Sequence, residues 1–380
     1  MIQMNTLRLH GAFSVHKADG SNITVDDKVS VINNAPQTLF RQIELMLNGV
    51  CVNDLSTSTY HYKAFIENHY SFDKDIKETT LSACEMYERD VPTLNSDPET
   101  ANVKDAKTNG FLKRKERILN GNQVHFILLI HLDFLQNKKY LIPNVEMKFR
   151  FIRNEDHFTV FCKTASPKIT MHYLELRVRK ITCDPVAVAG IEKALATTPA
   201  KYHVPHAKIK TFLLNNATQS QNISQIYRGK LPRSFHMLMV PSKGFDCDKA
   251  VNPFRFRHFD LSGFNAFING EPIHPKAITP DWSTEACLEQ YMWHLQNIGL
   301  HMNASNGISF EDFRDHSVMF SYDRTPDLCN SSVNHGIDTG TIDVSVAFKA
   351  PLAENVTLIF YGVFDECVTI DKDRNVVIVQ

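Results

Sequence analysis

The stretch FNAFINGEPI at residues 264–273 alternates apolar and polar residues up to an Asn-Gly pair, and a second short run leaves that pair. A similar stretch, IELMLNGVCV, occupies residues 43–52. Asn-Gly between alternating runs is a strong signal for a β-hairpin, because a type I′ turn needs positive φ at both central residues. We therefore predict tight hairpin turns at two pairs, Asn48-Gly49 and Asn269-Gly270.

The elements around the two hairpins recur in the same order. In each half, strands of period two lead into the Asn-Gly pair, and a helical segment follows, at residues 56–72 and 285–300. Further strands then complete each half. Many short strands separated by turn signals are typical of β-sandwiches. We predict an all-β fold of two tandem jelly-roll domains, each a β-sandwich with short helical insertions.

The segment CDPVAVAGIEKALATTPAKYHVPH at 183–206 marks the boundary between these domains. Asp184 before Pro185 is a favourable N-cap and first helical position, and Pro199 and Pro205 bracket the exit. The predicted division is a first jelly roll at 1–183, a linker helix at 184–200 and a second jelly roll at 201–380.

Composition narrows the function classes. The chain has 380 residues, enough for two domains, and 43% of them are hydrophobic, enough for a core in each half. The formal net charge of −1 argues against a dedicated or sequence-specific nucleic-acid binder, which needs a basic excess. The N-terminus has no secretory leader pattern, and no apolar run has the ~18 residues that a membrane span needs.

Motifs for catalysis or metal binding are missing from the sequence. It contains no phosphate-binding GxxxxGK[ST] loop, no HExxH, no GxSxG and no GxGxxG, and its eight cysteines form no CxxC pair. HVPH at 203–206 is interpreted as a plain linker, and FEDFRDH at 310–316 as a solvated turn before a strand. We predict that the protein is not an enzyme and has no catalytic, cofactor or metal site.

A longer series of motifs resembles a known family over nearly the full length. It includes KADGSNI (17–23), VINNAPQTLFRQIELMLNG (31–49), HLDFLQNKKYLIPNVEMKFRFIRNEDHF (131–158), GKLPRSFHMLMV (229–240), NPFRFRHFDLSGFNAFINGEPI (252–273) and PLAENVTLIFYGVFDECVTIDKDRNVV (351–377). In this order they resemble the double jelly-roll major capsid proteins of Polinton/Maverick elements and adintoviruses.

This resemblance implies a structural subunit of a virion. Three chains would form a homotrimer that is nearly six-fold in outline, and trimers would tile an icosahedral shell, with a penton-type capsid protein as a candidate further partner. Assembly would take place in the host nucleus or cytoplasm. In that family a substantial segment precedes the KADGS motif, so we expect the first jelly roll to lack its first strand here.

Three other functions remain open from the sequence. A β-sandwich binding module, such as a lectin, would share the strand pattern, but simple lectins seldom carry a helix after each hairpin. A tandem cupin enzyme would use some of the 17 histidines, but no clustered His-x-His with a Glu is present. A domesticated protein that derives from a transposon would keep the fold without the capsid function.

Overall fold

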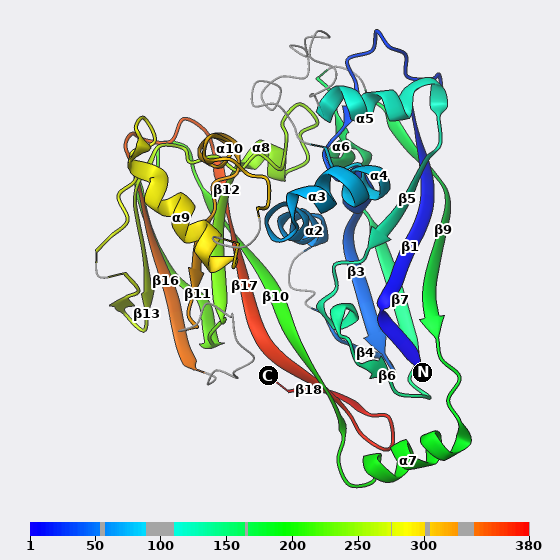
Figure 1. Cartoon of the computed structure of the whole chain (residues 1–380). Helices are drawn as coiled ribbons and strands as arrows, with labels where there is room; N and C mark the ends of the chain where they lie inside the picture. The colour runs from blue at the N-terminus through cyan, green and yellow to red at the C-terminus, as the bar shows by residue number, and fades with distance from the viewer. Residues whose placement is uncertain are drawn as a thin grey trace.

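The structure is a computed structural model that describes residues 1–53, 58–88, 110–163, 166–274, 276–300, 305–325 and 338–379. Strands in several sheets make up most of it, and short helices lie between and around the sheets. Figure 1 shows the two groups of strands side by side, with α7 (Pro185–Leu195) below, between the end of the first half and the start of the second.

The second half contains two sheets, and its first four strands in chain order alternate between them. One sheet has the strand order β10 (Ala200–Leu214), β17 (Val356–Ile370), β12 (Ser234–Pro241), β15 (Phe320–Asp323), and β18 (Val376–Val379) also pairs with β17. The other has the order β11 (Ser220–Lys230), β16 (Thr339–Phe348), β13 (Leu261–Ile268), β14 (Glu271–Pro272). Alternate residues of β16 are buried because one face of its sheet covers the core.

The first half has a shorter version of the same arrangement. In one sheet, β1 (Ile2–His16) lies between β5 (Val124–Leu129) and β9 (Lys168–Lys180), and β6 (Tyr140–Leu141) pairs with the start of β1. In another, β3 (Phe40–Leu47) lies between β4 (Val50–Cys51) and β7 (Met147–Arg153). A small sheet joins β2 (Ser30–Val31) and β8 (Val160–Phe161).

The two halves correspond strand by strand. The order β9-β1-β5 matches β17-β12-β15, and the order β7-β3-β4 matches β16-β13-β14. The outer strands of the second half are β10, which pairs with β17, and β11, which pairs with β16. Among the described residues of the first half, no strand takes either of these two places.

Helices follow the hairpin in both halves, as predicted. After β4 come α2 (Tyr60–Ile66), η1 (Glu67–Ser71), α3 (Lys74–Ile76), η2 (Lys77–Leu81) and α4 (Ser82–Glu85). After β14 come η7 (Glu285–Cys287), α9 (Leu288–Asn297) and α10 (Phe310–His316). The remaining helices are α1 (Ala35–Thr38), α5 (Gly110–Ile118), η5 (Leu119–Gly121), η6 (Asp133–Gln136), α6 (Asp156–Thr159) and α8 (Ser242–Phe245).

The boundary helix begins as its sequence predicts. The Asp184 side chain caps α7 by accepting a hydrogen bond from the backbone N–H of Val186, and Pro185 takes the first helical position. HVPH, however, is not a linker, since residues 203–206 lie within β10. Pro205 is tolerated there because β10 is an edge strand, where a missing N–H costs no ladder hydrogen bond.

The prediction of a solvated turn at 310–316 is wrong, because these residues form α10. Ser309 and Asp312 make a reciprocal capping box at its start, and the side chain of Phe313 is fully buried. The carboxylates that suggested a polar turn therefore serve in part to start a helix, and its apolar face packs on the core.

Candidate functional site

An aromatic cluster joins the first half to the second at a seam. Phe65 of α2 stacks on Phe254 with ring centroids 4.0 Å apart, and both side chains are buried. Tyr62 stacks on Phe245 at 5.2 Å and meets Phe254 edge-on. The helical segment of the first half, residues 60–85, therefore contributes side chains to the core of the second half.

The second half reaches into the first in return. Tyr202 and Val204 at the start of β10, and Val368 and Ile370 at the end of β17, belong to the apolar core that β1 and β3 build. The hydroxyl of Tyr202 donates a hydrogen bond to the carbonyl oxygen of Tyr140 on β6. The halves thus share two cores, which fixes their relative orientation through packing on both sides of the seam.

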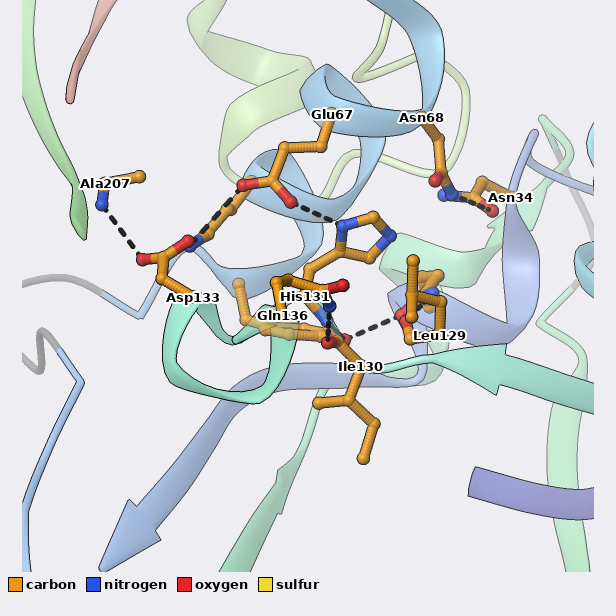
Figure 2. A network of polar contacts seen from close by, with 12 residues as sticks. Asn34, Glu67, Asn68, Leu129, Ile130, His131, Asp133, Gln136 and Ala207 are labelled. Carbon is orange, nitrogen blue, oxygen red and sulfur yellow. Dashed lines mark hydrogen bonds and ion pairs between the residues drawn. The ribbon is translucent and has the colours of Figure 1, made fainter. Parts of the chain in front are cut away.

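A buried ion network crosses the same seam (Figure 2). Lys63 of α2 pairs with Asp133 of η6 and lies 3.4 Å from a carboxylate oxygen of Glu67. Asp133 accepts a hydrogen bond of 2.9 Å from the backbone N–H of Ala207 on β10. Glu67 accepts one of 2.9 Å from the hydroxyl of Tyr361 on β17. Both carboxylates therefore connect first-half helices to second-half strands.

Attraction between opposite charges favours the ionised forms of Glu67 and Lys63. Burial alone would raise the pKa of Glu67, but Lys63 and the His131 imidazole, whose Nδ1 lies 2.5 Å from the carboxylate, outweigh burial and lower that pKa to about 2. Burial would lower the pKa of Lys63, and the attraction of Asp133 and Glu67 reverses the direction. The chain thus buries opposite charges in contact with one another where its halves meet.

A third buried carboxylate fixes the helical segment to the strands of the first half. Glu85 of α4 is almost fully buried and accepts hydrogen bonds from the side-chain amides of Gln37 and Asn68 and from the backbone N–H of Leu129. Burial raises the pKa of this carboxyl, although all three hydrogen bonds favour its charged form. Figure 2 shows Asn68 beside Asn34, whose side-chain oxygen accepts a hydrogen bond from the Asn68 amide.

The two Asn-Gly pairs occupy two-residue connections between short antiparallel strands. Residues 48 and 49 connect the paired residues Leu47 and Val50. Residues 269 and 270 connect the paired residues Ile268 and Glu271. All four have positive φ: 46° at Asn48, 83° at Gly49, 53° at Asn269 and 86° at Gly270.

Each turn also makes the same contact with a neighbouring strand. The backbone N–H of Asn48 donates to the Glu146 carbonyl oxygen, and the Asn48 side-chain oxygen accepts from the Glu146 N–H. Asn269 forms the same reciprocal pair with Thr341. The repeated turn thus extends the pairing of β3 towards β7 and of β13 towards β16, which supplies a structural reason for finding Asn-Gly twice.

Replacing Gly49 or Gly270 by Val is expected to destabilise the protein by about 1–3 kcal/mol, because a β-branched residue is strained at positive φ. An added Cβ meets no atom within 4 Å at either site, so the expected loss comes from backbone strain and not from a clash at Cβ. Gly190→Val in α7 is the matched control, since an added Cβ there also meets no atom within 4 Å but the residue has no positive φ. Chemical denaturation that gives equal stabilities for all three variants would contradict this role.

Among the described residues, no strand covers the outer edges of the two larger sheets in the first half. Leu9 on β1 is 0% exposed, but its partner Leu176 on β9 is 40% exposed although the pair shares the core face. Leu174, opposite Gly11, is 37% exposed. In the second half, the matching strand β17 keeps Leu358 and Phe360 almost fully buried, because β10 covers its outer edge.

The second sheet of the first half shows the same opening. Phe149 and Phe151 on β7 are only partly buried, whereas their partners Leu45 and Ile43 on β3 are fully buried. Within the described ranges β7 pairs only with β3, and β9 only with β1. The first half therefore presents two adjacent sheet edges with apolar side chains and unpaired backbone groups.

Within the described part of the chain, no group of three or more His, Cys, Asp or Glu side chains is arranged to hold a metal ion. None of its helices has the length and apolar character that a bilayer crossing needs. The polar residues brought together at the seam bind one another. Sequence reasoning missed this network, although His131 and Asp133 interrupt an otherwise apolar run at 125–135.

Comparisons with known proteins place this fold among viral capsid proteins. No family model matches the chain. An uncharacterized protein of Caenorhabditis elegans is 20% identical over 369 residues, which cover 94% of this chain and 83% of that protein. The Sputnik virophage structure matches with a TM-score of 0.62 and 9% identity, over 98% of this chain and 82% of that one.

Two further solved structures agree. The Faustovirus major capsid protein matches with a TM-score of 0.56 and 8% identity, over 96% of this chain and 77% of that chain. The mavirus major capsid protein matches with a TM-score of 0.51 and 9% identity, over 98% and 83%. The prediction of two tandem sandwiches is confirmed: the chain has the double jelly-roll fold of viral major capsid proteins.

Proposed function

We propose that the protein is a major capsid subunit that forms trimers nearly six-fold in outline, and that these trimers tile an icosahedral shell. The observation that carries the proposal is the pair of jelly rolls, locked side by side through shared cores and matched over almost the whole chain by capsid folds. The resemblance to Polinton/Maverick and adintovirus capsid proteins supports the same function. Its partner is another copy of itself, with a penton-type protein as a further candidate.

The seam suits this function physically. A trimer imitates a hexagon only if its two jelly rolls hold a constant angle, so that all three chains present the same pair of edges. Packing of Phe65 on Phe254 and the Lys63–Asp133 ion pair resist rotation between the halves. The balanced net charge of −1 also limits repulsion between many copies in one shell.

The uncovered edges of the first half have a role in this proposal. We propose that β9 and β7 accept two antiparallel strands in the working assembly, as β17 and β16 accept β10 and β11. Backbone pairing at the edges would supply affinity, and apolar side chains that cover Leu174, Leu176 and Phe149 would supply specificity.

Purified protein is expected to behave as a homotrimer. Three copies of the 43.3-kDa chain amount to about 130 kDa, and stable interfaces of this kind bury at least ~1,200 Å² in total. Light scattering after size exclusion, across micromolar concentrations, measures the mass. A species of 43.3 kDa at every concentration would count against the proposal.

A further inference from the structure

Four histidines and one lysine come together on the second-half side of the seam. His69 and Lys77 belong to η1 and η2 of the first half, and His236, His294 and His316 belong to β12, α9 and α10 of the second. We call these five residues the basic cluster. His294 is fully buried, Lys77, His236 and His316 are nearly so, and His69 is partly buried.

Contacts of the basic cluster cross the seam. The His69 imidazole lies between the Tyr87 hydroxyl, at 2.6 Å, and the Ser317 hydroxyl, at 2.9 Å. The Lys77 ammonium donates hydrogen bonds to the carbonyl oxygens of His69 and Asn306. These contacts fix the helical segment 60–85 to residues on either side of α10.

The second-half imidazoles have few polar partners. Nε2 of His294, Nδ1 of His236 and both ring nitrogens of His316 are buried without a hydrogen-bond partner. The ring of His294 packs between aromatic rings, with Tyr70 at 5.0 Å and Phe313 at 5.4 Å. An added proton on these rings would therefore create a cation in apolar surroundings.

Charges around the basic cluster do not compensate for burial. Burial lowers the pKa of His294 to about 3 and of His236 and His316 to about 4, and it lowers that of His69 well below its ordinary value. Burial also lowers the pKa of Lys77 to about 7. The charged groups that face the cluster are Asp73 near Lys77, Asp323 near His236, and Arg255, Asp312 and Asp315 near His316.

We propose that the basic cluster is an acid-sensitive latch between the two halves, which holds the helical segment 60–85 on α9 and α10 near neutral pH and releases it on acidification. Below neutral pH Lys77 carries its charge in the closed state, so each further proton on an imidazole adds a like charge close to it. Release lets all five groups reach water. The latch acts within one chain and does not depend on the capsid assignment.

The direction follows from proton binding. A released histidine titrates near its ordinary value of 6.5, whereas the closed state takes up the proton only near pH 3 or 4. The open state binds more protons between these limits, so closure weakens as pH falls below 6.5. Each such histidine changes the open-to-closed ratio about tenfold per pH unit. Glu67 does not contribute there, because its stabilisation is lost only below its ordinary value of about 4.5.

Hydrogen exchange of the full chain between pH 7.0 and 4.5 tests the latch, after correction for the intrinsic pH dependence of exchange. Protection of residues 60–85 should fall steeply below pH 6.5, whereas protection in β17, at the centre of the second half, should fall less. His294→Phe keeps an aromatic ring and cannot bind the proton. The open-to-closed ratio of this variant should therefore change by a factor about tenfold smaller per pH unit than that of the wild type. The double variant His236→Phe/His294→Phe should lose about two of these tenfold factors per pH unit.

His125→Phe, at an exposed position on β5, is the matched control and should leave the wild-type pH dependence unchanged. Other buried histidines, including His61 at the seam, contribute to the wild-type slope, so the difference between variants is decisive. If His294→Phe changes protection by the same factor at every pH, the ring has only a packing role and the latch is wrong. The latch would also be wrong if other parts of the chain lost protection at a higher pH than residues 60–85.

Discussion

Lys63→Met is expected to lower the free energy of unfolding by about 3–5 kcal/mol, since removal of one partner leaves buried charges uncompensated. The Asp133 and Glu67 side chains that face Lys63 are 12% and 22% exposed, so water screens them poorly. Methionine fills a similar volume, which separates loss of charge from loss of packing. Urea denaturation at pH 7 measures the effect.

Lys74→Met is the matched control for that experiment. Lys74 forms a pair with Glu78 at the same i,i+4 spacing as Lys63 and Glu67, but both side chains of the control pair are more than half exposed. Exposed pairs contribute about 0–1 kcal/mol, so this variant should be close to wild type. Equal losses in the two variants would show that the seam network is no more important than an ordinary surface pair.

The second large effect is expected in hydrogen exchange of the isolated subunit at neutral pH. Amides of β9 and β7 that point away from β1 and β3 should exchange with almost no protection. Those of β17 and β16, which are paired on both sides, should exchange only when the protein opens almost completely. Such an opening costs a free energy close to that of global unfolding, about 5–15 kcal/mol. The difference arises because β10 and β11 have no counterpart among the described strands of the first half.

Internal controls come from the same strands. Amides of β9 that donate to β1 are hydrogen-bonded within the sheet. They should therefore exchange more slowly than their immediate neighbours, which face the open side. If β9 and β7 accept strands in the assembly, the amides on their open sides should become more protected when the subunit assembles. Uniformly strong protection in residues 1–180 of the monomer, matching 201–380, would contradict the open-edge interpretation.

Local patterns in the sequence were sufficient for the strands and for the hairpin-then-helix order. Alternation at Leu7, Leu9, Phe13 and Val15 predicts β1, because each of these side chains faces one core. Helical spacing in segment 56–72 predicts a helix, and α2 with η1 confirms it over residues 60–71, whereas residues 56 and 57 lie outside the described residues.

Long-range arrangement could not be read from the same patterns. Phe254 lies 189 positions after Phe65, and nothing local indicates that the two rings stack. The charges of the seam are equally hidden, because Lys63, Glu67 and Asp133 look like surface residues until the fold brings them together. The segment FEDFRDH does not reveal its helix, because most of its polar residues lie on the cap and outer face of α10, while Phe313 and His316 are buried.

Electron microscopy of the purified full chain tests directly whether the protein assembles as a capsid subunit. We expect trimers in which six similar densities, two from each chain, give a nearly hexagonal outline, and closed shells of such trimers at high concentration. Monomers or dimers at every concentration, with two lobes whose angle varies from particle to particle, would contradict both the capsid function and the rigid seam on which it depends.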